Sequence, residues 1–256
     1  MRKLSSFVLV AVSLLGSNLK AQQLSQASVA PQRDPQALAL LGQCASAMGA
    51  TGIVPDLYLE GTISSKNADK PPSTVVLKSK GTGQLRTEFT SSGIQQVFVV
   101  SNERGFSLAS GKKQNLALQA TAYFRPEHLS GFACTIDAAR PNIAISYGGL
   151  ETVGASTAHH IVFRAQSSDP LDILMSEFHL YLDSTTFRVV KTVTWAFSPQ
   201  TLDNRSTWET YYDNYQSVSG VLVPLRITHL LAGSEFDQWT FTTIRTDVPV
   251  SNADFE

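Results

Sequence analysis

The segment FHLYLDSTTFRVVKTVTWAF (residues 178–197) decides the fold class of this sequence. Phe178, Leu180 and Leu182 alternate with other residues, and a period of two is typical of a β-strand with one buried face. Asp183-Ser184-Thr185 has the composition of a turn, and apolar residues resume beyond it. The segment therefore predicts a β-hairpin. One side of its second strand is expected to carry Val189, Val193, Trp195 and Phe197.

The same alternation recurs in both directions from this hairpin. Downstream it predicts strands at 208–212, 221–231 and 236–246. Upstream it predicts strands that start near residue 57 and lie at 74–79, 84–90, 94–101, 105–109, 143–147 and 158–164. Short turns containing Gly, Ser or Asn separate most of these runs, as in β-hairpins. The series predicts a mainly β protein: a strongly curved antiparallel sheet or an incomplete barrel.

Three stretches depart from this pattern. Asp34-Pro35 has the residues of a helix start, and apolar residues then recur at helical spacing as far as Gly49, which is placed to end the helix. We expect this N-terminal helix, together with short helices, to cover the sheet. Residues 114–140 show no clean period and predict short helices or a long packed loop. Residues 167–174 predict a loop with room for a helical turn, and Gly148-Gly149 predicts a turn.

The N-terminus has the pattern of a secretory signal peptide. Arg2 and Lys3 precede an apolar run from Leu4 to Leu15, and the small residue Ala21 offers a cleavage site. We therefore expect residues 1–21 to be a signal peptide and 22–33 to be a flexible leader. Residues 34–256 are expected to form a single β domain. The predicted location is periplasmic or secreted, with no transmembrane segment after cleavage.

The charge balance argues against a nucleic-acid partner. Removal of residues 1–21 leaves 17 Lys and Arg against 21 Asp and Glu, a net charge of −4. A protein that binds nucleic acid by neutralising phosphates needs a basic surface instead. We therefore expect no nucleic-acid binding.

The two cysteines, Cys44 and Cys134, leave two alternatives open. In an oxidising compartment, a pair of cysteines favours one disulfide. Closing so long a loop is worth about 4 to 5 kcal/mol in the chain-entropy model, and often less in practice. The alternative is two buried apolar thiols.

Motifs that would indicate catalysis or a cofactor are absent from the sequence. It lacks GxSxG, GxGxxG, the P-loop and HExxH. His159 and His160 are adjacent, and neighbouring residues on a strand point to opposite faces, so they are poorly placed to bind one metal ion. We therefore expect a protein that is not an enzyme and has no cofactor and no metal site.

Large aromatic residues at alternating strand positions are the strongest candidates for a ligand site. They have two interpretations: a filled hydrophobic core, or the wall of an apolar cavity enclosed by a bent sheet and the helix. The candidate ligand-binding residues are Phe98, Phe178, Trp195, Phe197, Trp239 and Phe241.

The last third of the chain carries a family resemblance. The segment WETYYDNYQSVSGVLVP (208–224) contains the pattern Y-x-x-V-x-G-x-x-x-P, and YLDSTTF (181–187) precedes it. These segments, with the N-terminal helix and the closing Asp254-Phe255, resemble the LolA/LolB-like outer-membrane lipoprotein-sorting family. The resemblance implies about eleven antiparallel strands bent into an incomplete barrel, with helices over an apolar concave face. The family includes carriers of acylated lipoproteins and other lipid-binding proteins.

The leading hypothesis is a non-enzymatic binding protein outside the cytoplasm whose partner is a hydrophobic ligand, a lipid or an acyl chain. One alternative is an interaction or structural protein of the cell envelope with a filled core and a protein partner. A secreted hydrolase is the weaker third alternative.

Overall fold

The computed structural model of the 256-residue chain describes residues 32–50, 55–66, 73–81, 83–101, 104–117, 142–197, 205–246, 248 and 250–256. The chain divides into two units, residues 1–30 and 31–256, and all the described residues belong to the second. The expectations for residues 1–31, the signal peptide included, lie outside the described residues. No helix in the described part of the chain is long and apolar enough to cross a bilayer.

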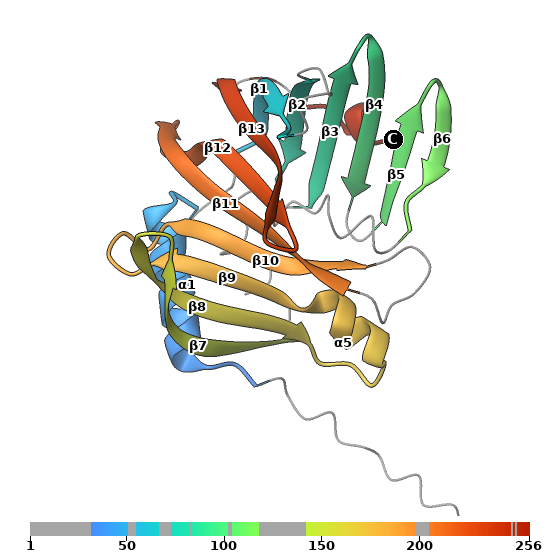
Figure 1. Ribbon diagram of the computed structural model, residues 1–256. Helices are drawn as coiled ribbons and strands as arrows, with labels where there is room; N and C mark the ends of the chain where they lie inside the picture. Colours follow the sequence, from blue (N-terminus) through green and yellow to red (C-terminus); the bar gives the residue numbers. More distant parts are fainter. Residues whose placement is uncertain are drawn as a thin grey trace, which may run out of the picture. The chain divides into compact units, whose positions relative to one another are not determined.

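In the described part of the second unit, thirteen strands form one antiparallel sheet (Figure 1). The strand order is β6-β5-β4-β3-β2-β1-β13-β12-β11-β10-β9-β8-β7. The strands are β1 (Leu57–Ser64), β2 (Ser73–Lys80), β3 (Gln84–Ser91), β4 (Ile94–Ser101), β5 (Arg104–Ala109), β6 (Lys112–Asn115), β7 (Ile143–Val153), β8 (Ser156–Ala165), β9 (Phe178–Asp183), β10 (Val189–Phe197), β11 (Arg205–Val218), β12 (Val221–Leu231) and β13 (Ser234–Arg245). The predicted mainly β, antiparallel fold is confirmed, with thirteen strands where the resemblance implied about eleven.

The sheet is open, and its two edges are β6 and β7. β6 is short, and its exposed residues include Lys112 and Lys113, which discourage another strand from pairing with this edge. The β7 edge is bridged at one point: the Ile145 amide donates to the Gln32 carbonyl at 3.0 Å, and the Asp34 amide donates to the Ile145 carbonyl at 2.9 Å. The last residues of the predicted leader therefore lie against β7.

The N-terminal helix α1 (Pro35–Ala47) begins as predicted. The Asp34 carboxylate accepts hydrogen bonds from the amides of Gln36 and Ala37, at 2.7 and 3.3 Å. Gly49 follows the helix in the left-handed region, with φ +73°, and a Cβ there would lie 1.9 Å from the Gly220 carbonyl oxygen. Glycine is therefore required where α1 meets the β11–β12 turn, because any side chain would collide with the backbone.

The core lies between α1 and one face of the sheet. Ala37, Cys44 and Met48 are fully buried in the same cluster as Ile145, Ile161 and Leu180, and α1 packs chiefly against β7. We call this face of the sheet the inner face and the opposite one the outer face. Directly paired residues on neighbouring strands share a face, so the strand register assigns every other side chain to one of the two.

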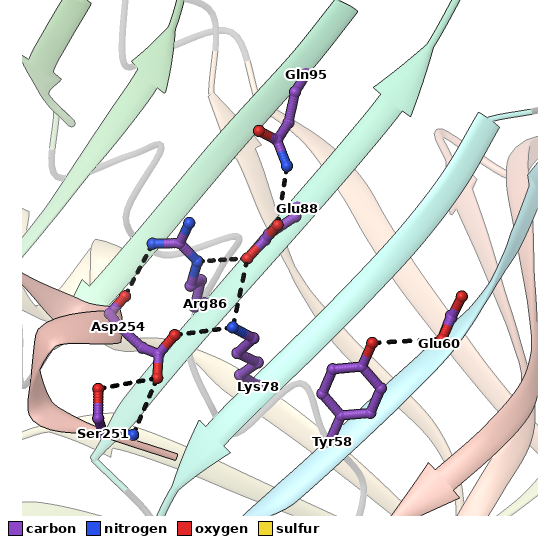
Figure 2. A network of polar contacts seen from close by, with 8 residues as sticks. All are labelled: Tyr58, Glu60, Lys78, Arg86, Glu88, Gln95, Ser251 and Asp254. Carbon is purple, nitrogen blue, oxygen red and sulfur yellow. Dashed lines mark hydrogen bonds and ion pairs between the residues drawn. The ribbon is translucent and has the colours of Figure 1, made fainter. Parts of the chain in front are cut away.

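The C-terminus covers part of the outer face. The 3-10 turn η2 (Asn252–Phe255) places Phe255 in a small buried cluster with Val97, Val99 and Val250. Figure 2 shows the polar contacts beside it: the Lys78 ammonium lies 2.8 Å from the Asp254 carboxylate, and Arg86 donates to the Asp254 carbonyl at 3.0 Å. The hydrogen bond from Lys78 outweighs partial burial and lowers the pKa of Asp254.

Two β-bulges explain why the structure differs from two sequence-based predictions. β7 continues through Gly148-Gly149, where a turn was predicted, because a bulge between Tyr147 and Gly149 absorbs the irregularity. A second bulge, between Val189 and Lys191, shifts the alternation of β10. Val189 is therefore buried in the core, while Trp195 and Phe197 pair with Thr207 and Arg205 on the outer face. The prediction that all of these β10 residues share one side is wrong.

The remaining departures concern segment lengths. The segment 167–174, predicted as a loop with room for a helical turn, contains part of a short helix, α5 (Pro170–Ser176), which packs beside β8 (Figure 1). Of the irregular stretch 114–140, residues 114 and 115 close β6, whereas 118–140 lie outside the described residues. β11 extends well beyond the predicted 208–212.

Cys44 is fully buried on α1 and is disulfide-bonded. Cys134 lies outside the described residues, so its pairing with Cys44 stays a prediction.

We expect the Cys44–Cys134 bridge to resist alkylation until the protein is unfolded and reduced. Mass spectrometry of the alkylated protein, with and without reductant, checks this. Removing both cysteines (Cys44→Ala with Cys134→Ala) should lower the free energy of unfolding by about 2 to 5 kcal/mol, because the unfolded chain regains loop entropy. Two alkylated thiols without reductant would contradict the pairing.

Gly49→Ala should destabilise the protein by about 2 kcal/mol or more, because it combines a left-handed backbone with a collision at Gly220. Gly42→Ala is the matched control. Gly42 is exposed on the same helix with nothing near its Cβ position, so alanine there should stabilise by up to about 1 kcal/mol. Urea unfolding midpoints at equal m-value measure both changes. Equal effects of the two variants would contradict the close approach of α1 to the β11–β12 turn.

Candidate functional site

Aromatic side chains from several strands meet on the inner face. Phe89 of β3 lies 5.7 Å from Phe98 of β4 and 5.6 Å from Trp239 of β13, ring centre to ring centre. Trp239 also contacts Phe241 at 6.4 Å and the His229 ring at 4.9 Å. Trp208 of β11 contacts His229 at 5.3 Å. We call these six residues the inner aromatic cluster.

The strand register explains why these residues share a face. Ile227 of β12 belongs to the core and pairs with Trp239, and its neighbour two positions on, His229, pairs with Thr210. On the other side, the core residue Val75 of β2 pairs with Phe89. Directly paired residues lie on the same face of the sheet. The register therefore brings the cluster residues to the inner face, although they come from strands as far apart as β3 and β11.

The cluster is only partly covered by protein. Phe241 is 2% exposed and His229 is 7% exposed. Phe89, Phe98, Trp208 and Trp239 are half-buried instead. Partly exposed aromatic rings from four strands offer apolar surface to a ligand, since each such ring carries a large apolar area.

Two polar groups are built into this apolar surface. The His229 Nδ1 lies 2.6 Å from the Asp237 carboxylate, which fixes the orientation of the ring. The Trp239 Nε1 is buried and has no hydrogen-bond partner among the described residues. Beside the cluster, the hydroxyl groups of Thr192 and Tyr212 lie 3.1 Å apart, and burial raises the pKa of Tyr212 so that its hydroxyl stays neutral.

The six predicted ligand-binding residues separate into three groups. Phe98, Trp239 and Phe241 are members of the inner aromatic cluster. Phe178 is also on the inner face but is buried in the core, 5.8 Å from Phe163. Trp195 and Phe197 lie on the outer face, so they do not line one surface with the other four. The role of the inner residues in ligand binding stays a prediction.

The surroundings of Trp195 are polar. Its Nε1 donates to the Glu177 carboxylate at 3.0 Å, and the Arg205 guanidinium lies 3.9 Å from the ring centre. Trp195 is therefore held in a charged environment, which does not suit the wall of an apolar cavity.

Sequence reasoning missed Phe89, Trp208 and His229 as members of the cluster. Phe89 and Trp208 alternate in their strands in the same way as the residues that were selected. Only the pairing of β3 with β2 and of β11 with β12 shows that they point to the same face. Knowledge of the strand register would have been needed to select them.

A separate open groove of about 470 Å³ lies at the tips of the β3–β4 and β5–β6 hairpins. Arg86, Val97 and Leu108 line it, and these residues belong to the outer face. Within the described residues, no group of three or more His, Cys, Asp or Glu side chains is arranged to hold a metal ion.

The fold of the described residues is similar to that of LolA-like proteins of known structure. The chain is similar to a LolA superfamily protein from Nitrosomonas europaea at 12% identity, with a TM-score of 0.59 over 86% of this chain and 97% of the other. It is also similar to an outer membrane lipoprotein-sorting protein domain from Vibrio parahaemolyticus (9% identity, TM-score 0.59, 86% and 96% covered). A DUF1329 family protein from Desulfovibrio piger gives 11% identity and a TM-score of 0.58 over 86% and 97%.

These similarities confirm the predicted fold-level resemblance to the LolA family. At 9 to 12% identity they establish the fold alone. No protein-family model and no curated relative matches the sequence.

Proposed function

We propose that this protein binds an acyl chain or another lipid-like molecule on the inner face of its sheet, without catalysing a reaction. The four partly exposed rings of the inner aromatic cluster carry the proposal. The cluster presents apolar rings from β3, β4, β11 and β13 on the same face that packs against α1. The likeness to a lipoprotein-sorting domain supports the same interpretation at the level of the fold.

Burial of apolar surface would supply the affinity. Removing hydrocarbon from water is worth about 25 cal/mol per Å², before the entropy costs of binding. The sequence pattern at residues 2–21 supports a location in the periplasm or outside the cell, where such a carrier would act between membranes.

Trp239→Ala should weaken the binding of a fluorescent acyl probe such as cis-parinaric acid by at least about tenfold, because a large aromatic contact is removed. Phe98→Ala, on another strand of the same cluster, should weaken it in the same direction. Trp195→Ala is the matched control: it removes the same side chain from the outer face and should leave the dissociation constant unchanged. Fluorescence titration measures binding, and urea unfolding shows whether each variant is folded.

Native mass spectrometry of protein purified from its own cells, followed by organic extraction, gives an independent test. We expect a fatty acid or phospholipid at close to one per chain. A bare mass and no uptake of the acyl probe would contradict lipid binding and favour an envelope interaction protein with a filled core. Equal loss of binding in the Trp195 and Trp239 variants would contradict a ligand site on the inner face.

A further inference from the structure

Four titratable side chains form a continuous chain across the outer face of β7, β8 and β9. The Glu151 Oε1 lies 2.7 Å from the His160 Nδ1. The His160 Nε2 lies 2.8 Å from the His179 Nδ1, and the His179 Nε2 lies 3.2 Å from the Glu177 Oε1. We call these four residues the outer histidine chain. It was not visible in the sequence, where His160 and His179 are 19 residues apart.

Counting protons shows that these three contacts fit only one protonation state. With both carboxylates ionised, each contact needs one N–H, so the four ring nitrogens must carry three protons. Two neutral imidazoles carry two protons, which leaves one contact without a donor. Two imidazolium rings carry four, which places two N–H groups against each other at 2.8 Å. Only a pair that shares one extra proton makes all three hydrogen bonds.

Neighbouring side chains stabilise the charge at one end of the outer histidine chain. The Arg164 guanidinium binds the Glu177 carboxylate, and Trp195 donates to it. Burial alone would raise the pKa of Glu177, but the hydrogen bonds from His179, Trp195 and Arg164 outweigh it, so the pKa is lowered and the carboxylate is charged.

Further charged and titratable groups surround the His160 ring. Tyr181 stacks on it at 4.5 Å with an interplanar angle of 5°. Lys191 lies over Tyr181 and pairs with Glu209 at 2.6 Å, with Tyr211 beside them. Burial, opposed by Glu151 and reinforced by the positive charges of His179 and Lys191, lowers the pKa of His160. The environment therefore resists a charge on this ring.

The backbone is shaped around the same ring. A Cβ at Gly148, in the β7 bulge, would lie 2.6 Å from the His160 Nδ1. The side chain of His160 is only 12% exposed and that of His179 is 20% exposed. The His160 ring is therefore closely packed against β7, so a movement of this ring away from His179 would disturb β7.

We propose that the outer histidine chain is a proton-linked latch for the edge strand β7. With one shared proton it ties β7 to β8 and β9, and a second proton opens it. The closed latch binds one proton fewer than two free imidazoles do in acid. The latch therefore weakens as the pH falls below the ordinary histidine pKa of about 6.5, because opening then takes up a proton. Above that pH two free imidazoles carry no extra proton, so opening releases the shared one and the latch weakens there as well; its stability is greatest near pH 6.5.

Hydrogen exchange of the β7 amides, corrected for the intrinsic pH dependence of exchange, tests the proposal. In the wild-type protein, protection should be greatest near pH 6.5 and should fall towards pH 5, by up to about tenfold per pH unit, because opening then takes up one proton. It should also fall towards pH 8, because opening then releases the shared proton. His179→Asn keeps a donor near the Nδ1 position but cannot be protonated, so it should flatten this response. His159→Gln is the control: His159 is adjacent in sequence but bonds to Tyr147 on the inner side, so the response should persist.

The ring nitrogens can be observed directly by ¹⁵N NMR. Near pH 6.5, we expect three protonated nitrogens and one unprotonated nitrogen over His160 and His179, and four protonated nitrogens once acid opens the latch. Two neutral rings that persist as the pH falls to about 6.5 would overturn the shared proton. Full protonation of both rings with unchanged β7 protection would overturn the latch.

Discussion

The packing of α1 against the inner face is the interaction on which the rest of this structure depends. One short helix and the residue that caps it bury Ala37, Cys44 and Met48 completely against a sheet of thirteen strands. Such a helix can cover only part of so large a sheet, and it packs chiefly against β7. The aromatic rings of β3, β4, β11 and β13 share the inner face with this core but remain half-exposed. The difference between these two regions of the inner face makes the aromatic cluster a candidate ligand surface.

The pleat of the sheet separates two kinds of chemistry. The inner face is largely apolar, with His229 and Asp237 as a part-buried polar pair. The outer face between β7 and β11 carries charged groups that pair with one another, among them Lys191 with Glu209 and Arg164 with Glu177. Neighbouring residues such as His159 and His160 therefore belong to different environments. Tyr147 bonds the first, and Glu151 and His179 bond the second.

The similarity to LolA-like structures, at only 9 to 12% identity, shows that very different sequences form this kind of sheet. A sheet of this kind requires alternating apolar residues, turn residues between strands and one amphipathic helix, and many sequences satisfy those requirements. The residues that give each protein its own chemistry are not fixed by these requirements. A shared fold therefore leaves the function to be argued from the site.

The sequence by itself determined the local structure. Period-two alternation located most of the strands, Asp34-Pro35 placed the start of α1, and the 178–197 hairpin was placed correctly. These features could be predicted because they depend on residues close together in the chain. Only the tertiary structure decided which strands are neighbours and which face each residue occupies. The bulge at Val189 moved Trp195 and Phe197 away from Phe98 and Trp239, and strand pairing alone brought His160 to His179. A one-residue shift in register reverses every side chain beyond it, and nothing local in the sequence records that shift.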